Sequence, residues 1–511
     1  MTSPSRPASD CAAHVGASYG LPSRSRATSA TGNLTRLILD AVAQEPTRPA
    51  FVRPEGVGAH IVTYGALAER MGAYQRGLRT EGYAIGDRVL VLSRPTPEFY
   101  ALALAILASG MTLVLADGRL GAARMLQVLR DARADGVIAP PALMRWWPLV
   151  GALRRARRCS IGGRVVGALA LTELARRPGA LDVASVPADA PAIASFTSGN
   201  TGRPKRIVRS HAVLAAQHWA LAAAFPLAAG DVTFSAFPVA MLHNLCCGAT
   251  TVLPSGGMLA DPAALLELLQ AHGVTSLSAA PSLVGRLAQH ALASTPVRAL
   301  SGVVVGGGPV SRRLCDQILR AFPAADAHVL YGATEAEPIA TTRLAEVRDT
   351  SGEGFLVGCP VSGAALALDG RELLVRGSHV AGKRGRWHRT GDLARLDEEG
   401  RVWLLGRVGS TVVHRGRELA PYAVEAAVLS LNGVGAAALV AHRRTPQGEL
   451  ALELADHADA DAVVCAARAC LTRMGLSSLP VRVVARIPMD ARHGSKVQRA
   501  ELAQLLERGA A

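Results

Sequence analysis

Lysine is nearly absent from this chain, with three lysines among 511 residues against 52 arginines (55 basic residues minus 3). An exposed positive charge can be supplied by either residue. A compact ammonium on a flexible stem, however, cannot be replaced everywhere by a planar guanidinium. Lys205, Lys383 and Lys496 are therefore the first positions to inspect, with chance placement as the alternative for each.

Cysteine and aromatic residues are also few, which narrows the kinds of site to expect. Aromatics are 4% of the chain, and the eight cysteines include no CxxC pair, so neither a disulfide framework nor a zinc site is expected. We expect reduced, mostly buried thiols and a cytoplasmic protein. The longest apolar run, residues 99–116, is interrupted by Ser109 and Gly110. It predicts a buried helix followed by a buried strand, and no transmembrane segment.

Acidic residues are fewer than basic ones, and the net charge is +15. Such a charge suggests a nucleic-acid partner when the basic residues form a patch. Here they are scattered, and the denser groups at residues 154–158 and 383–386 are short. No zinc-finger spacing or aromatic RNA-binding signature accompanies them. We therefore expect solvated surface charge and no nucleic-acid partner.

Composition divides the chain into three parts. Residues 1–33 are rich in Ser, Ala, Arg, Pro and Thr without apolar periodicity, which predicts a disordered tail. Their Arg and Ser content also fits a transit peptide, whereas a secretory signal is not expected because they contain no continuous apolar segment. Residues 34–405 alternate helical stretches with short apolar runs. The pattern changes near residues 406–410, and residues 406–511 predict a small separate domain.

Continuous apolar runs indicate the fold class, which is α/β. The runs at residues 89–92, 112–115 and 303–305 are typical of strands buried on both faces. With the helical stretches between them, they predict a large domain of layered parallel-type sheets and crossover helices. The sequence of the small domain predicts an α+β lid. It starts with a helix opened by Pro421 and ends with a strand at residues 481–487.

A Gly-, Ser- and Thr-rich loop lies at residues 197–205, TSGNTGRPK, between a strand and a helix expected at 212–224. Its small residues let backbone N–H groups converge on an anion, its hydroxyls add donors, and Lys205 adds charge. The loop is not a Walker A loop, because Pro204 precedes Lys205 where Gly is required. On these residues alone, an ordinary surface loop is the alternative to a polyphosphate site.

This segment resembles the phosphate loop of the adenylate-forming (AMP-binding) superfamily, which includes acyl-CoA synthetases, peptide-synthetase adenylation domains and luciferases. The usual form there is (Y/F)TSG(T/S)TGxPKG, from which Asn200 and Arg206 depart. Five further segments resemble family motifs in the expected order: GGGPVS at 306–311, YGATE at 331–335, HRTGD at 388–392, GR at 406–407 and RHGSK at 492–496. The resemblance therefore extends over nearly the whole folded chain.

The resemblance implies nucleotide-binding and catalytic sets. Residues expected to bind ATP are Thr197, Ser198, Gly199, Thr201, Gly202, Lys205, Gly306, Gly307, Gly308, Tyr331, Gly332, Asp392 and Arg407. Within this set the loop residues and Lys205 hold the β- and γ-phosphates, the three consecutive glycines belong to the adenine pocket, and Asp392 and Arg407 serve the ribose.

The implied catalytic set is Thr334, Glu335 and Lys496. Thr334 contacts the α-phosphate, Glu335 is a ligand of Mg²⁺, and Lys496 bridges the acyl carboxylate and the α-phosphate. Charge neutralisation and positioning are what attack of a carboxylate on ATP needs. From the residues alone, Glu335 could equally pair with a surface Arg, and Asp392 could be a turn residue.

Lys496 lies in the small domain, so that domain must close for adenylation. The implied hinge is near residues 406–410. Gly409 keeps conformational freedom there but lacks the charge of the Asp or Lys common in the family. This departure bears on domain rotation and not on adenylation. Lys383 lies in no motif and is expected to be a surface residue.

The acid-binding pocket is expected near His243, Cys246, Gly306 and Pro338, and it looks apolar. Amino-acid-activating relatives usually have an Asp where this chain has Pro238. A buried ammonium without such a partner is costly, so an α-amino acid is disfavoured. His243 matches a position where acyl-CoA synthetases often have His or an aromatic residue; a packed core histidine is the alternative.

The resemblance predicts an AMP-forming acid ligase that converts a fatty or β-hydroxy acid to acyl-AMP with ATP and Mg²⁺. Transfer to CoA would follow. YGATEAEPIA at 331–340 and RHGSK at 492–496 also resemble olefin-pathway β-lactone synthetases, in which the substrate's own β-hydroxyl displaces AMP; Glu337 and Gly494 depart from that pattern. A non-catalytic nucleotide-binding relative is the remaining alternative, against which the retained Glu335, Asp392 and Lys496 argue.

Overall fold

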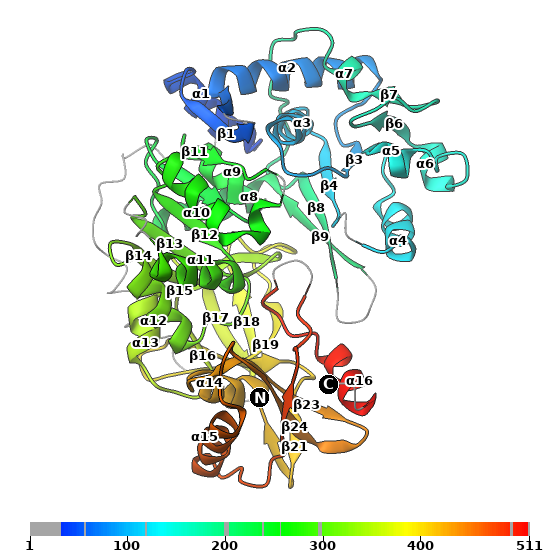
Figure 1. Cartoon of the computed structure of the whole chain (residues 1–511). Helices are drawn as coiled ribbons and strands as arrows, with labels where there is room; N and C mark the ends of the chain where they lie inside the picture. Colours follow the sequence, from blue (N-terminus) through cyan, green and yellow to red (C-terminus); the bar gives the residue numbers. More distant parts are fainter. Residues whose placement is uncertain are drawn as a thin grey trace.

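The structure is a computed structural model that describes residues 32–55, 58–117, 120–198, 204–237, 240–255, 257–294, 299–490 and 494–508. In this described part, the strands form sheets of thirteen, seven and three strands and one two-stranded hairpin. The large domain contains the first two sheets, and the small C-terminal domain, orange to red in Figure 1, contains the others. This arrangement confirms the predicted α/β architecture with a small α+β domain.

The seven-stranded sheet is parallel except at one edge, where β9 runs antiparallel to β8. Its strands, in spatial order, are β7 (Leu169–Ala170), β6 (Arg157–Ser160), β5 (Gly136–Ala139), β3 (Arg88–Val91), β4 (Thr112–Leu115), β8 (Pro191–Ser198) and β9 (Pro204–Ser210). The apolar runs at residues 89–92 and 112–115 are thus the buried central strands that the sequence predicts.

The thirteen-stranded sheet is antiparallel on one side and parallel on the other, except that the pair at the far edge of the parallel side is antiparallel. Its order is β17 (Ala365–Asp369), β18 (Glu372–Arg376), β19 (His388–Leu396), β20 (Val402–Arg407), β16 (Phe355–Pro360), β15 (Ala336–Arg343), β14 (Asp326–Ala333), β13 (Gly302–Gly306), β12 (Ser276–Ala279), β10 (Val232–Ser235), β11 (Thr250–Val252), β1 (Pro49–Glu55) and β2 (Gly58–Thr63). From β14 to β17 all pairings are antiparallel. The expectation of parallel-type sheets throughout residues 34–405 is therefore wrong here. Buried and less buried residues alternate along β19. One face of the antiparallel part of the sheet is therefore less covered than the other.

Helices cover the two sheets of the large domain (Figure 1). They are α1 (Thr35–Gln44), α2 (Tyr64–Thr80), α3 (Pro97–Ala108), α4 (Ala122–Ala132), α5 (Pro141–Met144), α6 (Gly151–Arg155), α7 (Leu171–Leu174), α8 (His211–Ala224), α9 (Ala240–Cys246), α10 (Pro262–Ala271), α11 (Pro281–Ala293), α12 (Arg312–Ala321), α13 (Leu344–Asp349) and the 3₁₀ turn η2 (Met258–Ala260).

The apolar run at residues 99–116 forms the buried helix α3 and the buried strand β4, as predicted. Thr96 caps α3 by accepting a hydrogen bond from the Phe99 N–H at 3.1 Å, and Pro97 fits the first turn because its missing N–H is not needed there. Among the described residues, no helix has both the length and the hydropathy that crossing a bilayer requires.

The folded chain includes Asn33, which the sequence analysis places in the tail. This side chain is buried and donates to the Leu107 carbonyl at 2.9 Å. The expectation of reduced thiols holds for six cysteines, which are free, whereas Cys359 is disulfide-bonded and departs from it.

The small domain contains the predicted helix, two strands, helix and strand in that order, but a hairpin precedes them and a helix follows the last strand, neither of which the sequence predicted. It comprises β21 (Val412–His414), β22 (Arg417–Leu419), α14 (Pro421–Leu429), β23 (Val434–His442), β24 (Thr445–Leu454), α15 (Ala460–Arg473), β25 (Val481–Val484) and α16 (Arg499–Arg508). A buried ion pair joins its layers: Arg499 of α16 bonds Glu425 of α14 at 2.6 and 2.9 Å. Glu425 also accepts the Leu439 N–H of β23 at 2.8 Å. This pairing fixes the base of α16, which directly follows Lys496.

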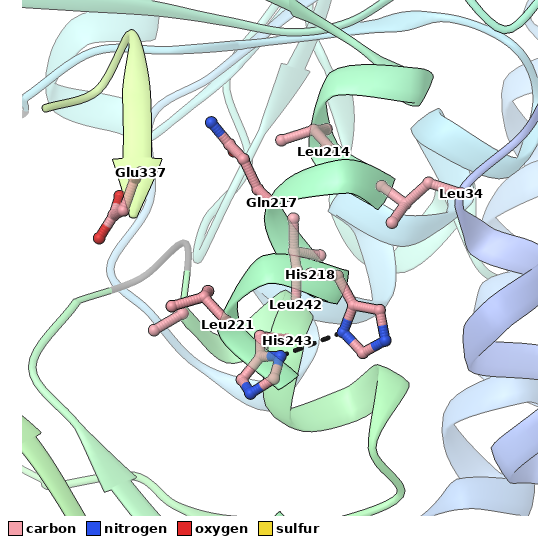
Figure 2. A pocket seen from close by; sticks show the side chains of 9 residues that line it. Leu34, Leu214, Gln217, His218, Leu221, Leu242, His243 and Glu337 are labelled. Carbon is pink, nitrogen blue, oxygen red and sulfur yellow. Dashed lines mark hydrogen bonds between the residues drawn. The ribbon is translucent and has the colours of Figure 1, made fainter. Parts of the chain in front are cut away.

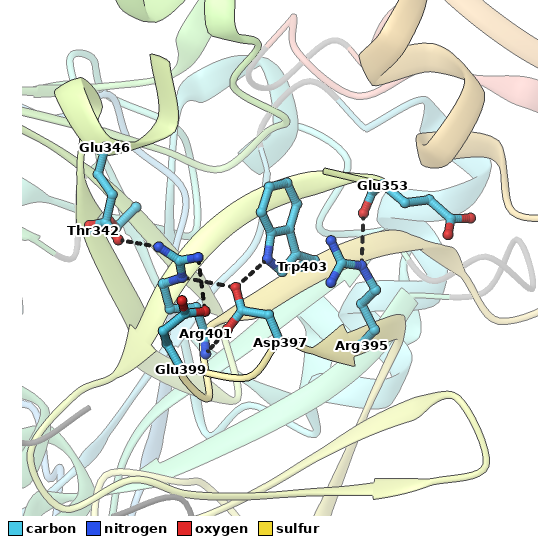
Figure 3. A network of polar contacts seen from close by, with 8 residues as sticks. All are labelled: Thr342, Glu346, Glu353, Arg395, Asp397, Glu399, Arg401 and Trp403. Atoms are coloured by element: carbon cyan, nitrogen blue, oxygen red, sulfur yellow. Dashed lines mark hydrogen bonds and ion pairs between the residues drawn. The ribbon is translucent and has the colours of Figure 1, made fainter. Parts of the chain in front are cut away.

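A polar network holds the hairpin of β19 and β20 (Figure 3). Arg401 bonds Asp397 at 2.8 Å, and the Trp403 indole N–H donates to the same carboxylate at 2.8 Å. Burial opposes ionisation of Asp397, but these hydrogen bonds prevail and lower its pKa. Arg395 lies 4.5 Å over the Trp403 ring. The network fixes the strand pair that holds Asp392 and Arg407.

Candidate active site

The predicted phosphate loop connects two antiparallel strands, since Thr197 is paired with Lys205 across β8 and β9. The helix α8 begins only after β9. The observed order is therefore strand, loop, strand and helix, which is one strand more than the sequence predicts. Gly199, Thr201 and Gly202 lie outside the described residues, as do the side chains of Thr197 and Ser198. Lys205 is the second residue of β9, and its side chain is 62% exposed.

Lys205 contacts Glu335, although 130 residues separate them in the chain. The Lys205 Nζ lies 3.0 Å from Glu335 Oε1. Glu335 and Thr334 lie in the tight turn between β14 and β15. The fold thus joins the phosphate-loop motif to the YGATE motif, and the partner of Glu335 is Lys205 and not the surface Arg considered from the sequence.

His388, the first residue of the HRTGD segment, lies close to the same pair. Burial lowers the pKa of His388, Glu335 opposes this change, and Lys205 adds to it. The sequence analysis assigned His388 no role, because nothing in its neighbours distinguishes it from any residue at the start of a strand.

Asp392 is buried and lies between an aromatic hydroxyl and a guanidinium. The Tyr331 hydroxyl donates to Asp392 Oδ2 at 2.7 Å, and Arg407 Nη1 donates to Oδ1 at 2.8 Å. Asp392 and Arg407 are paired across β19 and β20, whereas Tyr331 comes from β14. Asp392 is therefore a buried ionic centre and not a turn residue.

Burial and the neighbouring Asp392 carboxylate shift the pKa values of Tyr331 and Arg407. Burial and the neighbouring Asp392 raise the pKa of Tyr331 well above its usual value, so its hydroxyl stays protonated and donates. Burial opposes the charge of Arg407, but Asp392 prevails and raises the pKa of Arg407. A carboxylate has about four lone-pair positions, so Asp392 retains acceptor capacity beyond these two bonds.

Glycines are required where the GGGPVS segment meets its neighbours. A methyl group at Gly306 would lie 2.8 Å from the Leu330 carbonyl oxygen, and Gly307 has φ +82°. A methyl group at Gly308 would lie 2.5 Å from Cβ of Ser495, which belongs to the small domain. The small domain therefore rests directly on the predicted adenine-pocket segment.

Lys496 lies at the end of a tight loop that begins at Asp490. Asp490 Oδ1 accepts the backbone N–H groups of Ser495 at 3.1 Å and Lys496 at 2.8 Å. The Asp490 N–H donates to the Lys496 carbonyl at 2.8 Å, and Gly494 has φ +59°. The Asp490 carboxylate thus fixes the backbone on which Lys496 stands.

The two domains are joined by hydrogen bonds on both sides of this loop. The Ser282 N–H donates to Ser495 Oγ at 3.2 Å. Arg313 of α12 donates to the carbonyls of Leu431 at 3.3 Å and Val434 at 3.2 Å. These contacts place the backbone next to Lys496 against the predicted adenine-pocket segment. Lys383, by contrast, lies in an exposed turn between β18 and β19, as expected.

The predicted hinge has the conformational freedom that the sequence indicates. Gly406 has φ +151° and Gly409 has φ +79°, and a methyl group at Gly409 would meet nothing within 4 Å. Ser410 Oγ accepts the Arg407 N–H at 3.0 Å, which closes the turn. Rotation about this segment stays a prediction.

A small cavity of about 30 Å³ lies between α8, α9 and the start of β15 (Figure 2). Residues of α8 at helical spacing, Leu214, Gln217, His218 and Leu221, form one wall because they share a face of the helix. His243 and Glu337 also line the cavity, and the role of His243 in binding the acid stays a prediction. Of the other expected residues, Cys246 packs against the core beneath α9, and Pro338 is buried next to Glu337.

His218 and His243 form a hydrogen-bonded pair, with their Nδ1 atoms 3.1 Å apart. Burial lowers the pKa of His218 to about 4, and burial together with His218 lowers that of His243 to about 3. Both rings are therefore neutral near pH 7. His218, Gln217 and Glu337 line the cavity but were not among the pocket residues predicted from the sequence. The i, i+3, i+4, i+7 spacing on α8 was the available signal, but it does not say which face of the helix lines the cavity.

Cys247 lies 3.9 Å from the His243 ring nitrogens, so three ligand atoms come within 4.8 Å of one another. Burial raises the pKa of Cys247 to about 12, which keeps the thiol protonated. The two Nδ1 atoms face each other and not a common centre. We interpret the cluster as a neutral histidine pair beside a thiol, and not as a metal site.

The geometry brings together the phosphate loop, the YGATE turn, the buried Asp392 and the loop of Lys496. The AMP-binding enzyme model matches residues 38–383. The chain belongs to the AMP-binding enzyme family. It is an adenylate-forming acid ligase, an enzyme class that uses ATP.

Relatives within this family differ in substrate and acceptor. An olefin β-lactone synthetase from Stenotrophomonas maltophilia is 29% identical, with 88% of this chain and 92% of that protein covered. A feruloyl-CoA synthase from Amycolatopsis sp. is 27% identical over 77% of this chain and 84% of the relative. The crystal structure of an anthranilate CoA ligase in complex with anthranoyl-AMP has a TM-score of 0.82 at 20% identity, covering 94% of this chain and 98% of that one. The last likeness concerns the fold alone.

Proposed function

We propose that this AMP-binding enzyme activates a fatty or β-hydroxy acid with ATP. A carboxylate oxygen forms a bond to the α-phosphorus, the bond to pyrophosphate breaks, and acyl-AMP results. One observation supports this most directly: Ser495, the neighbour of Lys496, packs on Gly308 so closely that a methyl group there would lie 2.5 Å from its Cβ. A lysine from a separate domain is thereby held at the nucleotide-binding segment.

Lys205 and Glu335 serve the phosphates in this proposal. Their 3.0 Å contact brings a cation and a carboxylate together beside the predicted phosphate loop, which supports this assignment. Glu335 is partly buried and offers hard carboxylate oxygens, which fits Mg²⁺ because this ion is usually held by one or two carboxylates together with substrate phosphates. Bound Mg²⁺ would neutralise phosphate charge. Lys205 then pairs with the β- and γ-phosphates, and Thr334 with the α-phosphate.

Asp392 would accept the two ribose hydroxyls, with Arg407 supporting the ribose. Its carboxylate is held in position from two sides by Tyr331 and Arg407 before the nucleotide arrives. Pre-organised acceptors lose less entropy on binding. Lys496 would neutralise the charge that builds between the acyl carboxylate and the α-phosphate.

In the second step an acceptor attacks the acyl carbon and AMP leaves. A CoA thiolate as acceptor makes the enzyme an acyl-CoA ligase, as in the feruloyl-CoA synthase relative. The similarity to olefin β-lactone synthetases supports a second candidate, in which the substrate's own β-hydroxyl attacks. Such an intramolecular attack has a high effective molarity.

An acid panel tests both steps. The enzyme is incubated with ATP, Mg²⁺ and fatty, β-hydroxy and aryl acids, with and without CoA, and mass spectrometry detects AMP, acyl-CoA and β-lactone. We expect AMP with fatty or β-hydroxy acids. A CoA-dependent thioester identifies the ligase, and a CoA-independent β-lactone identifies the synthetase. Absence of AMP with every acid would contradict adenylation.

The Asp490 carboxylate gives a prediction about the loop of Lys496. Asp490→Ala removes the acceptor of two backbone N–H groups, each worth about 1 kcal/mol. We expect adenylation to slow about tenfold, and amide hydrogen exchange at Ser495 and Lys496 to accelerate. Asp490→Asn keeps a side-chain oxygen and should retain most activity. If Asp490→Ala adenylates at the normal rate, the loop does not depend on this carboxylate.

A further inference from the structure

The cavity beside α8 has walls of two kinds. Five lining residues are aliphatic: Leu34, Leu214, Leu221, Ala240 and Leu242. Four are polar: Gln217, His218, His243 and Glu337. The sequence analysis expected an apolar pocket, and the polar side is what the structure adds (Figure 2).

The polar side contains a single acidic residue among the lining residues described, Glu337. The two histidines are neutral because burial lowers the pKa of His218 to about 4 and of His243 to about 3. Gln217 donates its amide to the His379 carbonyl at 3.1 Å. The Glu337 carboxylate has enough lone pairs to accept a ligand's hydrogen bond besides any from the protein.

Glu337 lies next to the place where the substrate's carboxyl group must react. A methyl group at Gly332 would lie 3.3 Å from both Cα and Cγ of Glu337. Gly332 and Thr334 belong to the turn assigned to the nucleotide, and Glu337 follows Glu335 by two residues at the start of β15. Glu337 therefore packs against the segment assigned to the nucleotide, and its side chain lines the cavity.

We propose that Glu337 selects acids with a hydrogen-bond donor, a hydroxyl or an amine, close to the reacting carboxyl group. This inference rests on the proposed acid-activating function. The donor bonds the Glu337 carboxylate. An acid with such a donor gains a hydrogen bond to a charged acceptor that an unsubstituted acid cannot form. A β-hydroxyl held in this way is also oriented relative to the activated carbonyl.

The test uses three acids of equal chain length: unsubstituted, 3-hydroxy and 3-amino. AMP formation with ATP gives kcat/KM for each acid. The wild-type enzyme is expected to prefer at least one donor acid over the unsubstituted acid by about tenfold or more, as for a hydrogen bond to a charged group. In Glu337→Leu this ratio should fall to near one. A ratio within one enzyme preparation does not depend on how much of the variant is folded.

Glu337→Gln separates the two donors. A hydroxyl preference should survive it in large part, because the amide oxygen still accepts a hydrogen bond. An ammonium preference should fall about tenfold with the lost charge. Glu398→Gln, at an exposed position of the β19–β20 hairpin, is the matched control and should keep the wild-type ratios.

Two outcomes overturn the proposal: a wild-type enzyme that favours the unsubstituted acid, or a Glu337→Leu variant whose ratio equals the wild-type ratio. Both outcomes require that AMP is formed. Absence of AMP with all three acids and across the wider panel would instead contradict adenylation itself, so the two failures are distinguishable.

Discussion

Lys496→Ala is expected to slow acyl-AMP formation by at least about a hundredfold, because it removes the proposed cation between two reacting anions. The loop around Lys496 is held by Asp490 and by contact with Gly308, so the backbone should stay in place. Transfer from supplied acyl-AMP should continue largely intact, since the new acyl–phosphate bond already exists. Pyrophosphate release measures the first step, and AMP release from synthetic acyl-AMP measures the second.

Two further lysine variants sharpen this test. Lys383→Ala changes a residue of the same type in an exposed turn and should leave both steps unchanged. Lys496→Arg keeps the charge but substitutes a planar fork, and it should also be strongly impaired. Equal losses of both steps in Lys496→Ala would refute the two-step role. Full activity of Lys496→Arg would refute the requirement for an ammonium.

Asp392→Ala should weaken both the fold and the use of ATP. The variant leaves the buried Tyr331 hydroxyl without its acceptor at 2.7 Å, which should lower the free energy of unfolding by about 2 kcal/mol. Arg407 is half-exposed and can turn to water, so its lost partner adds less. Loss of the proposed ribose acceptor should lower kcat/KM for ATP by about a hundredfold. Chemical denaturation and steady-state kinetics measure the two effects.

Asp397 provides the matched control for Asp392. It lies on the same hairpin and accepts bonds from Arg401 and Trp403 at 2.8 Å, but it belongs to the network of Figure 3 and not to the proposed site. Asp397→Ala should destabilise the protein without changing the KM for ATP. If both variants change ATP kinetics alike, the effect of Asp392 is structural. If Asp392→Ala leaves the KM for ATP and kcat unchanged, it does not bind the ribose.

Local patterns predicted much of the fold because each depends on near neighbours. The run at residues 99–116 specifies a buried helix and strand by composition, and Thr96 and Pro97 fix where that helix starts. The antiparallel pairing from β14 to β17 in the thirteen-stranded sheet was not predicted. Strand direction depends on which strands pair, and β20, which forms a hairpin with β19, also pairs with β16, which is distant in sequence.

The candidate site divides in the same way. The motifs named Lys205, Glu335, Asp392 and Lys496 from their neighbours in the chain. Their partners were not readable, because Lys205 meets Glu335 across 130 residues and Tyr331 meets Asp392 across 61. The polar wall of the cavity was missed for the same reason. Gln217 and His218 look like ordinary positions of a helix until α8 is placed against β15.

The sequence by itself determined the family and much of the order of the elements, and it named the residues proposed for acid activation, since motif chemistry is local. It also indicated that the rare lysines are unequal, two in motifs and one outside. Only the tertiary structure decided that the loop of Lys496 rests on Gly308, and that Glu337 and a neutral histidine pair line the cavity proposed for the acid. These facts depend on packing between distant segments, which the periodicity of a single element cannot specify.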